Sequence, residues 1–138
     1  MREKVAVSAC LIGVNSKYDG TNNLRMDLLN ELKDKIVYVI CPEVLSGLST
    51  PRLPSEIKDE KVININGIDI TSIFLKGSTE VLNFLLSNNI KKVYLKDGSP
   101  SCGVTYIYDG SFTHRRVKGM GFTTKILKDN NIEVIPIQ

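Results

Sequence analysis

The chain has little that would mark it as a secreted or a membrane protein. Only three of its 138 residues are cysteine, which is too few, and an odd number, for the disulfide framework of a small secreted domain. No apolar run approaches the roughly 20 residues that a membrane helix needs, and the N-terminal residues resemble neither a signal nor a transit peptide. We therefore expect a protein of the cytoplasm, a reducing compartment in which thiols stay free.

The sequence also lacks a strong excess of charge of either sign. Its formal net charge is +3, and 42% of its residues are hydrophobic, as in an ordinary globular protein. Dedicated nucleic-acid-binding domains are usually much more basic, so this charge allows an RNA or an anionic substrate without arguing for either. The length fits one domain, which we expect to cover residues 1–138.

Short apolar runs alternate with amphipathic segments along the chain, which predicts alternating strands and helices. Such alternation implies a parallel sheet with right-handed crossovers, that is, a single Rossmann-like α/β domain with helices flanking the sheet. We expect the four strands, numbered in chain order, to lie in the order 2-1-3-4. The expected strands cover 4–9, 36–40, 92–96 and 132–137, and the expected helices cover 26–33, 71–88 and 121–130.

Two small hairpins are expected outside the main sheet. An Asn-Gly pair within the alternating run 62–70 is a strong two-residue turn signal, and an Asp-Gly pair predicts a second turn within 106–112. The segment 41–60 contains several prolines and glycines, and we expect it to form a loop.

The three cysteines all stand where an expected strand gives way to a loop. Cys10 and Cys41 directly follow the first and second strands, and Cys102 comes a few residues after the third. In an open parallel sheet, ligands bind at the carboxyl ends of the strands, and neighbouring strands lie about 5 Å apart. The predicted strand order therefore brings three thiols to one rim. Soft thiolates suit a soft metal or an iron–sulfur cluster, and three ligands leave one position open for chemistry.

Each cysteine alone also has a structural explanation, because free cysteine often behaves as a small buried hydrophobe. That explanation is at least as good for Cys10, at a strand end, and weaker for Cys102, which lies in a rigid polar turn. In the same turn, the hydroxyl of Ser101 could bond a sulfide or a substrate atom. Ser99 is instead expected to bond the backbone of its own turn.

Glu43 follows Cys41 by two residues, with the stiff residue Pro42 between them. A carboxylate held beside a metal centre could move protons during a reaction. It could equally satisfy backbone N–H groups at the start of a helix. The spacing alone does not separate these two roles.

Two polar segments outside the cysteine motifs are further candidates. Tyr18 and Asp19 lie in the loop that leaves the first strand, on the predicted rim, and could wall a substrate pocket. The basic segment 114–118 could meet a phosphate at the start of the last helix, although a solvated surface loop is the simpler interpretation.

Taken in order, these motifs resemble a family of small proteins, formerly a domain of unknown function, that is associated with thiouracil desulfurases (the TudS group). The cysteine motifs are specific, and the resemblance spans nearly the whole chain. The matching segments are SACLIG at 8–13, YDG at 18–20, CPEVL at 41–45, PRLP at 51–54, DIT at 69–71, SPSCG at 99–103, IYDG at 107–110 and GMG at 119–121.

The resemblance implies a 4Fe–4S cluster held by three cysteines, here Cys10, Cys41 and Cys102, with one open iron. That iron would take the sulfur of a thiocarbonyl, so that C=S becomes C=O and sulfide is released without net redox chemistry. The family's catalytic glutamate and serine correspond to Glu43 and Ser101. The implied substrate is 2-thiouracil or the 2-thiouridine unit of tRNA.

Other functions stay open on the sequence. The three thiolates could hold a structural zinc, but such sites are almost always four-coordinate, and His114, the only histidine, has no evident route to the rim. A small electron carrier is another possibility, although those proteins usually use four cysteines per cluster. Among substrates, we favour the small base over tRNA, because no broad basic face is evident and the basic segment is expected to lie away from the rim.

Overall fold

The structure is a computed structural model that describes residues 2–138. Its main sheet contains four parallel strands in the order β2-β1-β5-β8, which confirms both the α/β class and the predicted order 2-1-3-4. The strands are β1 (Lys4–Ser8), β2 (Ile36–Ile40), β5 (Lys92–Lys96) and β8 (Glu133–Ile137).

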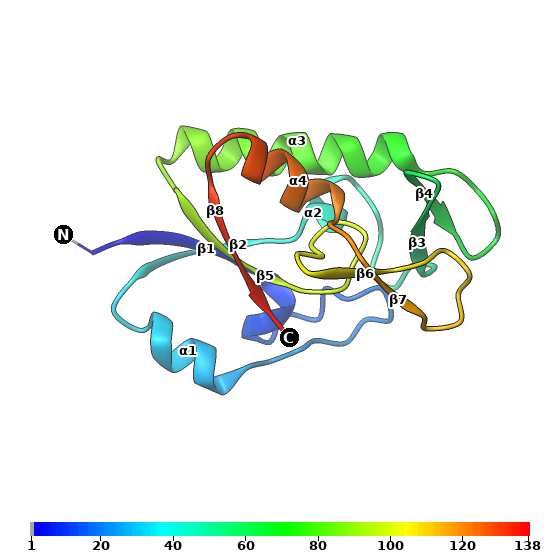
Figure 1. The fold of residues 1–138 in the computed structure, drawn as a ribbon. Helices are drawn as coiled ribbons and strands as arrows, with labels where there is room; N and C mark the ends of the chain where they lie inside the picture. The colour runs from blue at the N-terminus through cyan, green and yellow to red at the C-terminus, as the bar shows by residue number, and fades with distance from the viewer. Residues whose placement is uncertain (1) are drawn as a thin grey trace.

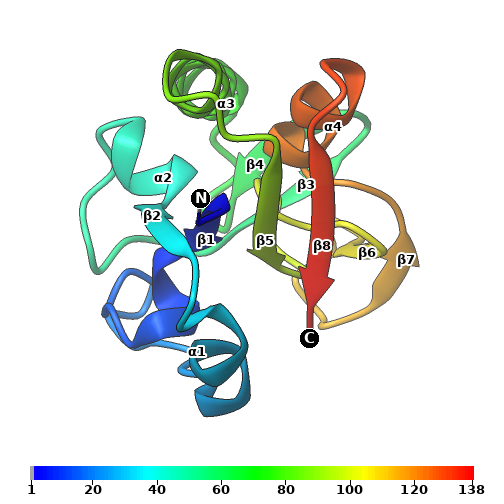
Figure 2. The same ribbon diagram turned by 90° about the vertical axis from the view of Figure 1, so that its left-hand side faces the viewer.

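Helices cover both faces of this sheet (Figures 1 and 2). The helices α3 (Thr71–Ser87) and α4 (Phe122–Asp129) lie on one face, and α1 (Met26–Leu32) lies on the other. Because successive side chains of a strand point to opposite faces, β1 serves both layers: Ala6 packs in the core under α3 and α4, whereas Val7 packs in the core over α1. Among the described residues, no helix combines the length and apolar character needed to cross a membrane.

The segment 41–60, predicted as a loop, contains two further elements, the short helix α2 (Pro42–Leu45) and the strand β3 (Ser55–Lys58). Proline suits the first position of a helix, where its missing N–H is not needed. Helix α2 packs closely against α3 at Gly77, where an added Cβ would lie only 2.3 Å from the carbonyl oxygen of Pro42. The absence of a side chain at Gly77 therefore allows the segment that follows β2 to approach the core.

The turn predicted at the Asn-Gly pair is present, but the two-stranded hairpin of this region is formed by the residues that precede it. The strand β3 pairs with β4 (Lys61–Asn64) through a two-residue turn at Asp59 and Glu60, which both have positive φ as such turns require. The chain also reverses at the Asn-Gly pair, where the N–H of Gly67 donates to the carbonyl oxygen of Asn64 at 2.8 Å and the N–H of Asn64 donates to that of Ile68 at 2.9 Å. The returning segment forms one isolated bridge with β4 and no strand of its own. Non-glycine residues rarely adopt positive φ, so the sequence did not mark the additional turn at Asp59 and Glu60.

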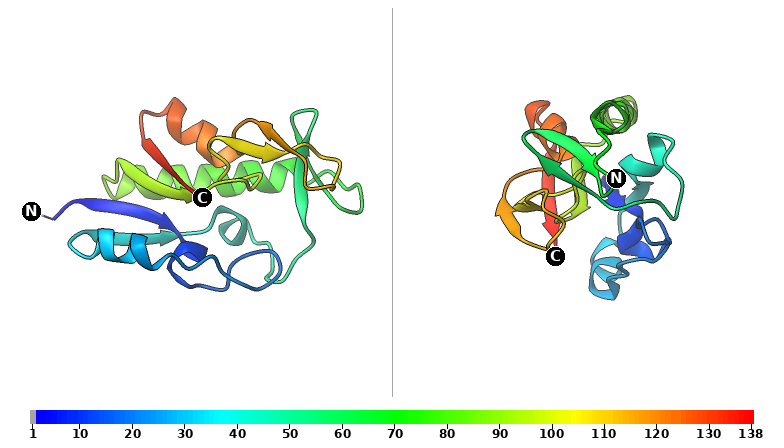
Figure 3. Two further views of the ribbon diagram at one scale, coloured as in Figure 1. Left: turned by 60° about the horizontal axis from the view of Figure 1, so that its bottom comes forward. Right: turned by 90° about the vertical axis from the view of Figure 1, so that its right-hand side faces the viewer.

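The second predicted hairpin begins at the correct strand but pairs with a later one. The strand β6 (Tyr106–Tyr108) pairs with β7 (Arg116–Lys118) across the loop 109–115, not across a short Asp-Gly turn. The two hairpins stand beside one another at the end of the molecule away from the N-terminus (Figure 3). Glu56 of β3 connects them, because its Oε1 accepts hydrogen bonds from the backbone N–H groups of the loop 109–115 at 3.0 and 3.1 Å.

Candidate active site

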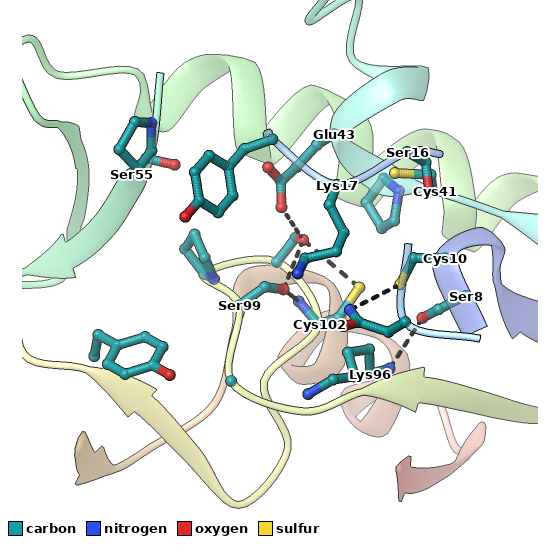
Figure 4. Close-up of a pocket in the computed structure, with 18 of the residues that line it drawn as sticks. Ser8, Cys10, Ser16, Lys17, Cys41, Glu43, Ser55, Lys96, Ser99 and Cys102 are labelled. Atoms are coloured by element: carbon teal, nitrogen blue, oxygen red, sulfur yellow. Dashed lines mark hydrogen bonds between the residues drawn. The ribbon is translucent and has the colours of Figure 1, made fainter. Parts of the chain in front are cut away.

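The carboxyl ends of β1, β2 and β5 border one pocket of about 520 Å³ (Figure 4). All three cysteines line this pocket, each from a different part of the chain. Cys10 lies in the short 3₁₀-helix η1 (Ala9–Ile12) after β1, Cys41 lies between β2 and α2, and Cys102 lies in the loop after β5. The strand order thus brings together thiols that are far apart in sequence.

The three thiols share the pocket without converging on a single point. Among residues 2–138, no group of three or more His, Cys, Asp or Glu side chains is arranged to hold one metal ion. The ligand set Cys10, Cys41 and Cys102 therefore stays a prediction. A ligand that contacts all three thiols would have to span the ends of three neighbouring strands, which are spaced about 5 Å per step.

Cys102 is buried and Cys10 is half-buried, and the sulfur atoms of both face hydrogen-bond donors. Burial raises the pKa of Cys10 and raises that of Cys102 to about 12, so these thiols need a bound cation to ionise near pH 7. The amide Nδ2 of Asn23 lies 3.6 Å from Cys10 Sγ, and the hydroxyl of Ser101 lies 3.6 Å from Cys102 Sγ. Donors aimed at sulfur support metal-bound thiolates, so the donor set fits an iron–sulfur cluster.

Glu43 faces the Cys102 loop from α2 (Figure 4), and side chains engage both of its carboxylate oxygens. Its Oε2 accepts a hydrogen bond from the hydroxyl of Ser101 at 2.9 Å, and its Oε1 accepts one from Nε of Arg52 at 3.2 Å. The alternative considered from the sequence, a carboxylate that serves the backbone at a helix start, is therefore wrong. Glu43 belongs to a side-chain network that reaches Cys102 through Ser101.

Ser99 has the turn role expected from the sequence. Its Oγ accepts a hydrogen bond from the backbone N–H of Cys102 at 2.7 Å, and it lies 3.2 Å from the Oγ of Ser101. Ser99 thereby holds the backbone of the turn that contains Ser101 and Cys102.

Of the two residues predicted to line a substrate pocket, Tyr18 and Asp19, only one does so. Tyr18 lines the pocket, whereas Asp19 is not among the lining residues. The carboxylate of Asp19 accepts hydrogen bonds from both the backbone N–H (3.0 Å) and the hydroxyl of Thr21, which closes a local turn. The substrate contact predicted for Tyr18 stays a prediction, and the structure does not bring Asp19 to the pocket.

Only the first residue of the basic segment 114–118 reaches the pocket, whereas Arg115, Arg116 and Lys118 are not among the lining residues. His114 lines the pocket, and its ring packs edge-on against that of Tyr108 at 6.3 Å. The guanidinium of Arg116 lies 4.2 Å over the ring of Tyr106, another lining residue. The long loop between β6 and β7 accounts for the position of His114, because it returns the chain to the pocket.

Comparison with known proteins identifies the family. Residues 5–138, nearly the whole chain, match the family described as 2-thiouracil desulfurase. The chain belongs to this family.

Two other proteins are similar to this chain over nearly its whole length. The uncharacterized protein YbbK of Bacillus subtilis (strain 168) is 33% identical over 141 residues, which cover 95% of this chain and 93% of YbbK. A solved structure of the 4Fe–4S-dependent thiouracil desulfidase TudS is 38% identical and superposes with a TM-score of 0.88, covering 98% of this chain and 91% of that one.

Several polar residues that line the pocket were not singled out from the sequence, among them Arg52, Asn23 and Lys96. Lys96, at the end of β5, is partly buried, and this burial lowers the pKa of its ammonium group. Arg52 lies within the PRLP segment that contributes to the resemblance. Neither Asn23 nor Lys96 belongs to a motif, so no sequence signal marked them.

The start of α4 holds the Cys102 loop and is not free for a phosphate. Its first backbone N–H groups are already paired with carbonyl oxygens of that loop, so the phosphate contact considered from the sequence is wrong. The pairs are Gly121 with Gly103 at 2.8 Å, Phe122 with Pro100 at 2.9 Å and Thr123 with Ser101 at 2.9 Å.

Asp97 supports the same loop from its other end. This carboxylate is only 3% exposed and follows β5 directly. Burial alone would raise the pKa of Asp97, but the hydrogen bonds that it accepts lower it to about 2. The donors are the backbone N–H groups of Gly98, Val104 and Thr105 and the side chains of Thr105 and Gln138.

We expect Asp97→Asn to destabilise the protein by an amount that depends on pH. A carboxylate with a lowered pKa stabilises the fold above its unfolded pKa of 3.8, and this contribution disappears as the pH falls through about 2. The difference in unfolding free energy from wild type should be on the order of 2 kcal/mol near pH 7 and shrink towards pH 2. Urea unfolding of cluster-free protein across this range measures it, with the exposed Asp129→Asn as control. A difference that does not depend on pH would contradict the role assigned to the Asp97 charge.

Proposed function

We propose that the protein is a thiouracil desulfurase that converts the thiocarbonyl of 2-thiouracil to a carbonyl and releases sulfide. The observation that carries this proposal is one pocket that holds three thiols and the Glu43–Ser101 pair, in a chain of the 2-thiouracil desulfurase family. The related structure is that of a 4Fe–4S-dependent thiouracil desulfidase, and by analogy we assign the same cofactor here.

The cluster would be held by Cys10, Cys41 and Cys102. These cysteines follow three neighbouring strands, and adjacent strands lie about 5 Å apart. This spacing suits a multi-iron cluster better than a single ion. When bound, such a cluster supplies a thiophilic, Lewis-acidic iron without a protein ligand, which can polarise a thiocarbonyl. A structural zinc, the rival considered from the sequence, would need a fourth ligand and a common centre for all four.

Ser101 and Glu43 would handle the protons. The Ser101 hydroxyl has one hydrogen but three acceptors within reach, namely Glu43 Oε2 at 2.9 Å, Ser99 Oγ at 3.2 Å and Cys102 Sγ at 3.6 Å. An ionised Glu43 draws this hydrogen to itself. A protonated Glu43 donates to the Ser101 oxygen instead, which frees the hydroxyl hydrogen to turn towards sulfur or substrate. The protonation of Glu43 therefore sets the direction of the Ser101 hydroxyl.

The overall reaction balances without an oxidant or a reductant. Water and the thiocarbonyl give the carbonyl and hydrogen sulfide, so one C=S bond is exchanged for one C=O bond. The two protons of water must leave oxygen and reach sulfur. Glu43 lies within hydrogen-bond reach of Ser101 and can accept and return a proton through it, as general acid–base catalysis requires.

The test is anaerobic purification, iron and sulfide analysis, and incubation with 2-thiouracil. We expect a brown protein with about four irons per chain, the content of a cubane cluster. Uracil should form from 2-thiouracil, and no added electron donor should be needed. A colourless protein with tightly bound zinc and no turnover would instead support a structural metal site.

A thiolated nucleotide of tRNA is the second candidate substrate. His114 lines the pocket and Arg116 lies over the ring of the lining residue Tyr106, which gives this candidate more support than the sequence did. We still prefer the free base, because the net charge of +3 is modest for a protein that docks nucleic acid.

Salt dependence separates the two substrates. We expect turnover of uncharged 2-thiouracil to change little between about 50 and 200 mM salt, whereas a protein that contacts six tRNA phosphates would lose on the order of 10³-fold in affinity. Turnover of each substrate is measured at both concentrations. Salt-sensitive activity on tRNA, with none on the free base, would overturn the preference and leave the desulfurase chemistry intact.

A further inference from the structure

Arg52 is a buried cation with an unusually complete set of partners. Its side chain is 8% exposed, and that of its partner Glu43 is 13% exposed. All three guanidinium nitrogens donate hydrogen bonds. The acceptors are Glu43 Oε1 (3.2 Å) for Nε, Ser16 O (2.9 Å) for Nη2, and Thr50 Oγ1 (3.0 Å) and Ser49 O (3.3 Å) for Nη1.

These contacts join three segments that form the pocket. Nε holds α2 through Glu43, Nη2 holds the loop after η1 through Ser16, and Nη1 holds the segment that carries Arg52 itself. The backbone N–H of Arg52 adds a hydrogen bond to the carbonyl oxygen of Tyr18 at 2.6 Å. Only a planar fork of donors can meet such divergent acceptors, so lysine is not an equivalent residue here.

The same contacts make the two oxygens of Glu43 different. Oε1 is occupied by Arg52, whereas Oε2 accepts from the hydroxyl of Ser101. Rotation of the carboxylate away from this orientation would break both hydrogen bonds, so Arg52 fixes the orientation in which one oxygen faces the cysteine loop. Stability alone does not explain this buried pair, because well-packed apolar residues of similar volume are often as stable.

We propose that Arg52 is a positioning residue of the reaction. It holds Glu43 by Oε1 so that Oε2 alone meets Ser101, and it seats the Ser16–Tyr18 segment as a wall of the same pocket. The catalytic part of this inference rests on the proposed desulfurase function.

The test is a double-mutant cycle with Arg52→Met and Glu43→Met, two substitutions that remove the polar atoms and keep most of the volume. We expect Arg52→Met alone to lower kcat per loaded cluster on the order of 10²-fold, the loss typical of a misplaced catalytic group. In the Glu43→Met background, the same change should lower the residual kcat less than about threefold, because residues that act as a unit are not additive.

Two further variants sharpen the result. Arg52→Lys keeps the charge but not the fork, and its kcat should stay at least about tenfold below wild type. Arg2→Met removes an exposed arginine that also donates to backbone carbonyl oxygens, and it should leave kcat within about twofold. The proposal is overturned if Arg52→Met keeps kcat within about threefold of wild type, or if it lowers kcat equally in both backgrounds.

A stability readout makes the inference independent of activity. In cluster-free protein, Arg52→Met leaves a buried carboxylate without its cation, whereas the double variant removes both charges. The double variant should therefore melt at a higher temperature than Arg52→Met. If the wild type fails to desulfurate any substrate, the proposed function fails, and this comparison alone decides whether Arg52 and Glu43 are coupled. Additive losses in melting temperature would refute the coupling.

Discussion

Replacement of Cys102 by alanine is expected to leave a folded protein that has lost most of its iron. The side chain is 7% exposed at the pocket, and a cluster held by three thiolates loses a third of its protein ligands with this change. Iron and acid-labile sulfide per chain, measured after anaerobic purification, give the result directly. Cys10→Ala and Cys41→Ala should behave in the same way.

The matched control for this prediction is Val104→Ala. Val104 lies in the same loop and the same buried cluster as Cys102, so its truncation costs packing without removing a thiol. We expect it to lower the melting temperature and to retain iron close to the wild-type amount. If all three cysteine variants keep a full cluster, the ligand assignment is wrong.

The second large effect concerns Glu43. Glu43→Gln should keep the cluster but lose on the order of 10²-fold or more in turnover, because an amide can still accept a hydrogen bond from Ser101 or Arg52 and cannot take up a proton. Turnover per loaded cluster and melting temperature are measured on the same preparation. A purely structural carboxylate would lower the melting temperature and leave turnover nearly unchanged.

A second glutamate of the pocket provides the comparison for Glu43. The carboxylate of Glu56 accepts backbone N–H groups of Gly110 and Phe112 and thereby joins the two hairpins. Glu56→Gln should affect stability more than turnover, and we expect turnover to stay within about tenfold of wild type. An equal loss of turnover in both variants would indicate that the Glu43 effect is an indirect one.

The parts of the fold that the sequence predicted follow strong local rules. All four parallel strands, the buried β1 and β5 and the half-buried edge strands β2 and β8, read as short continuous apolar runs, which located them. The preference for right-handed crossovers then limited the strand order. Because cysteines follow three of these strands, their common pocket could be inferred without any knowledge of side-chain contacts.

The parts that the sequence did not predict depend on contacts between distant segments. The turn at Asp59 and Glu60 needs positive φ from non-glycine residues, and only the pairing of β3 with β4 holds them there. The ion pair of Arg52 with Glu43 joins residues nine apart with no helical or strand period between them. The placement of His114 follows from a loop whose path is set by its contact with Glu56 of the neighbouring hairpin.

The most direct test of the central claim is the joint measurement of uracil and sulfide from 2-thiouracil in ¹⁸O-labelled water. The protein is purified and assayed without oxygen and without any added electron donor or acceptor. The account predicts one sulfide for each uracil and one labelled oxygen in the product, because the reaction exchanges sulfur for the oxygen of water. Unlabelled uracil, a strict need for an electron donor, or no uracil from cluster-loaded protein would contradict it.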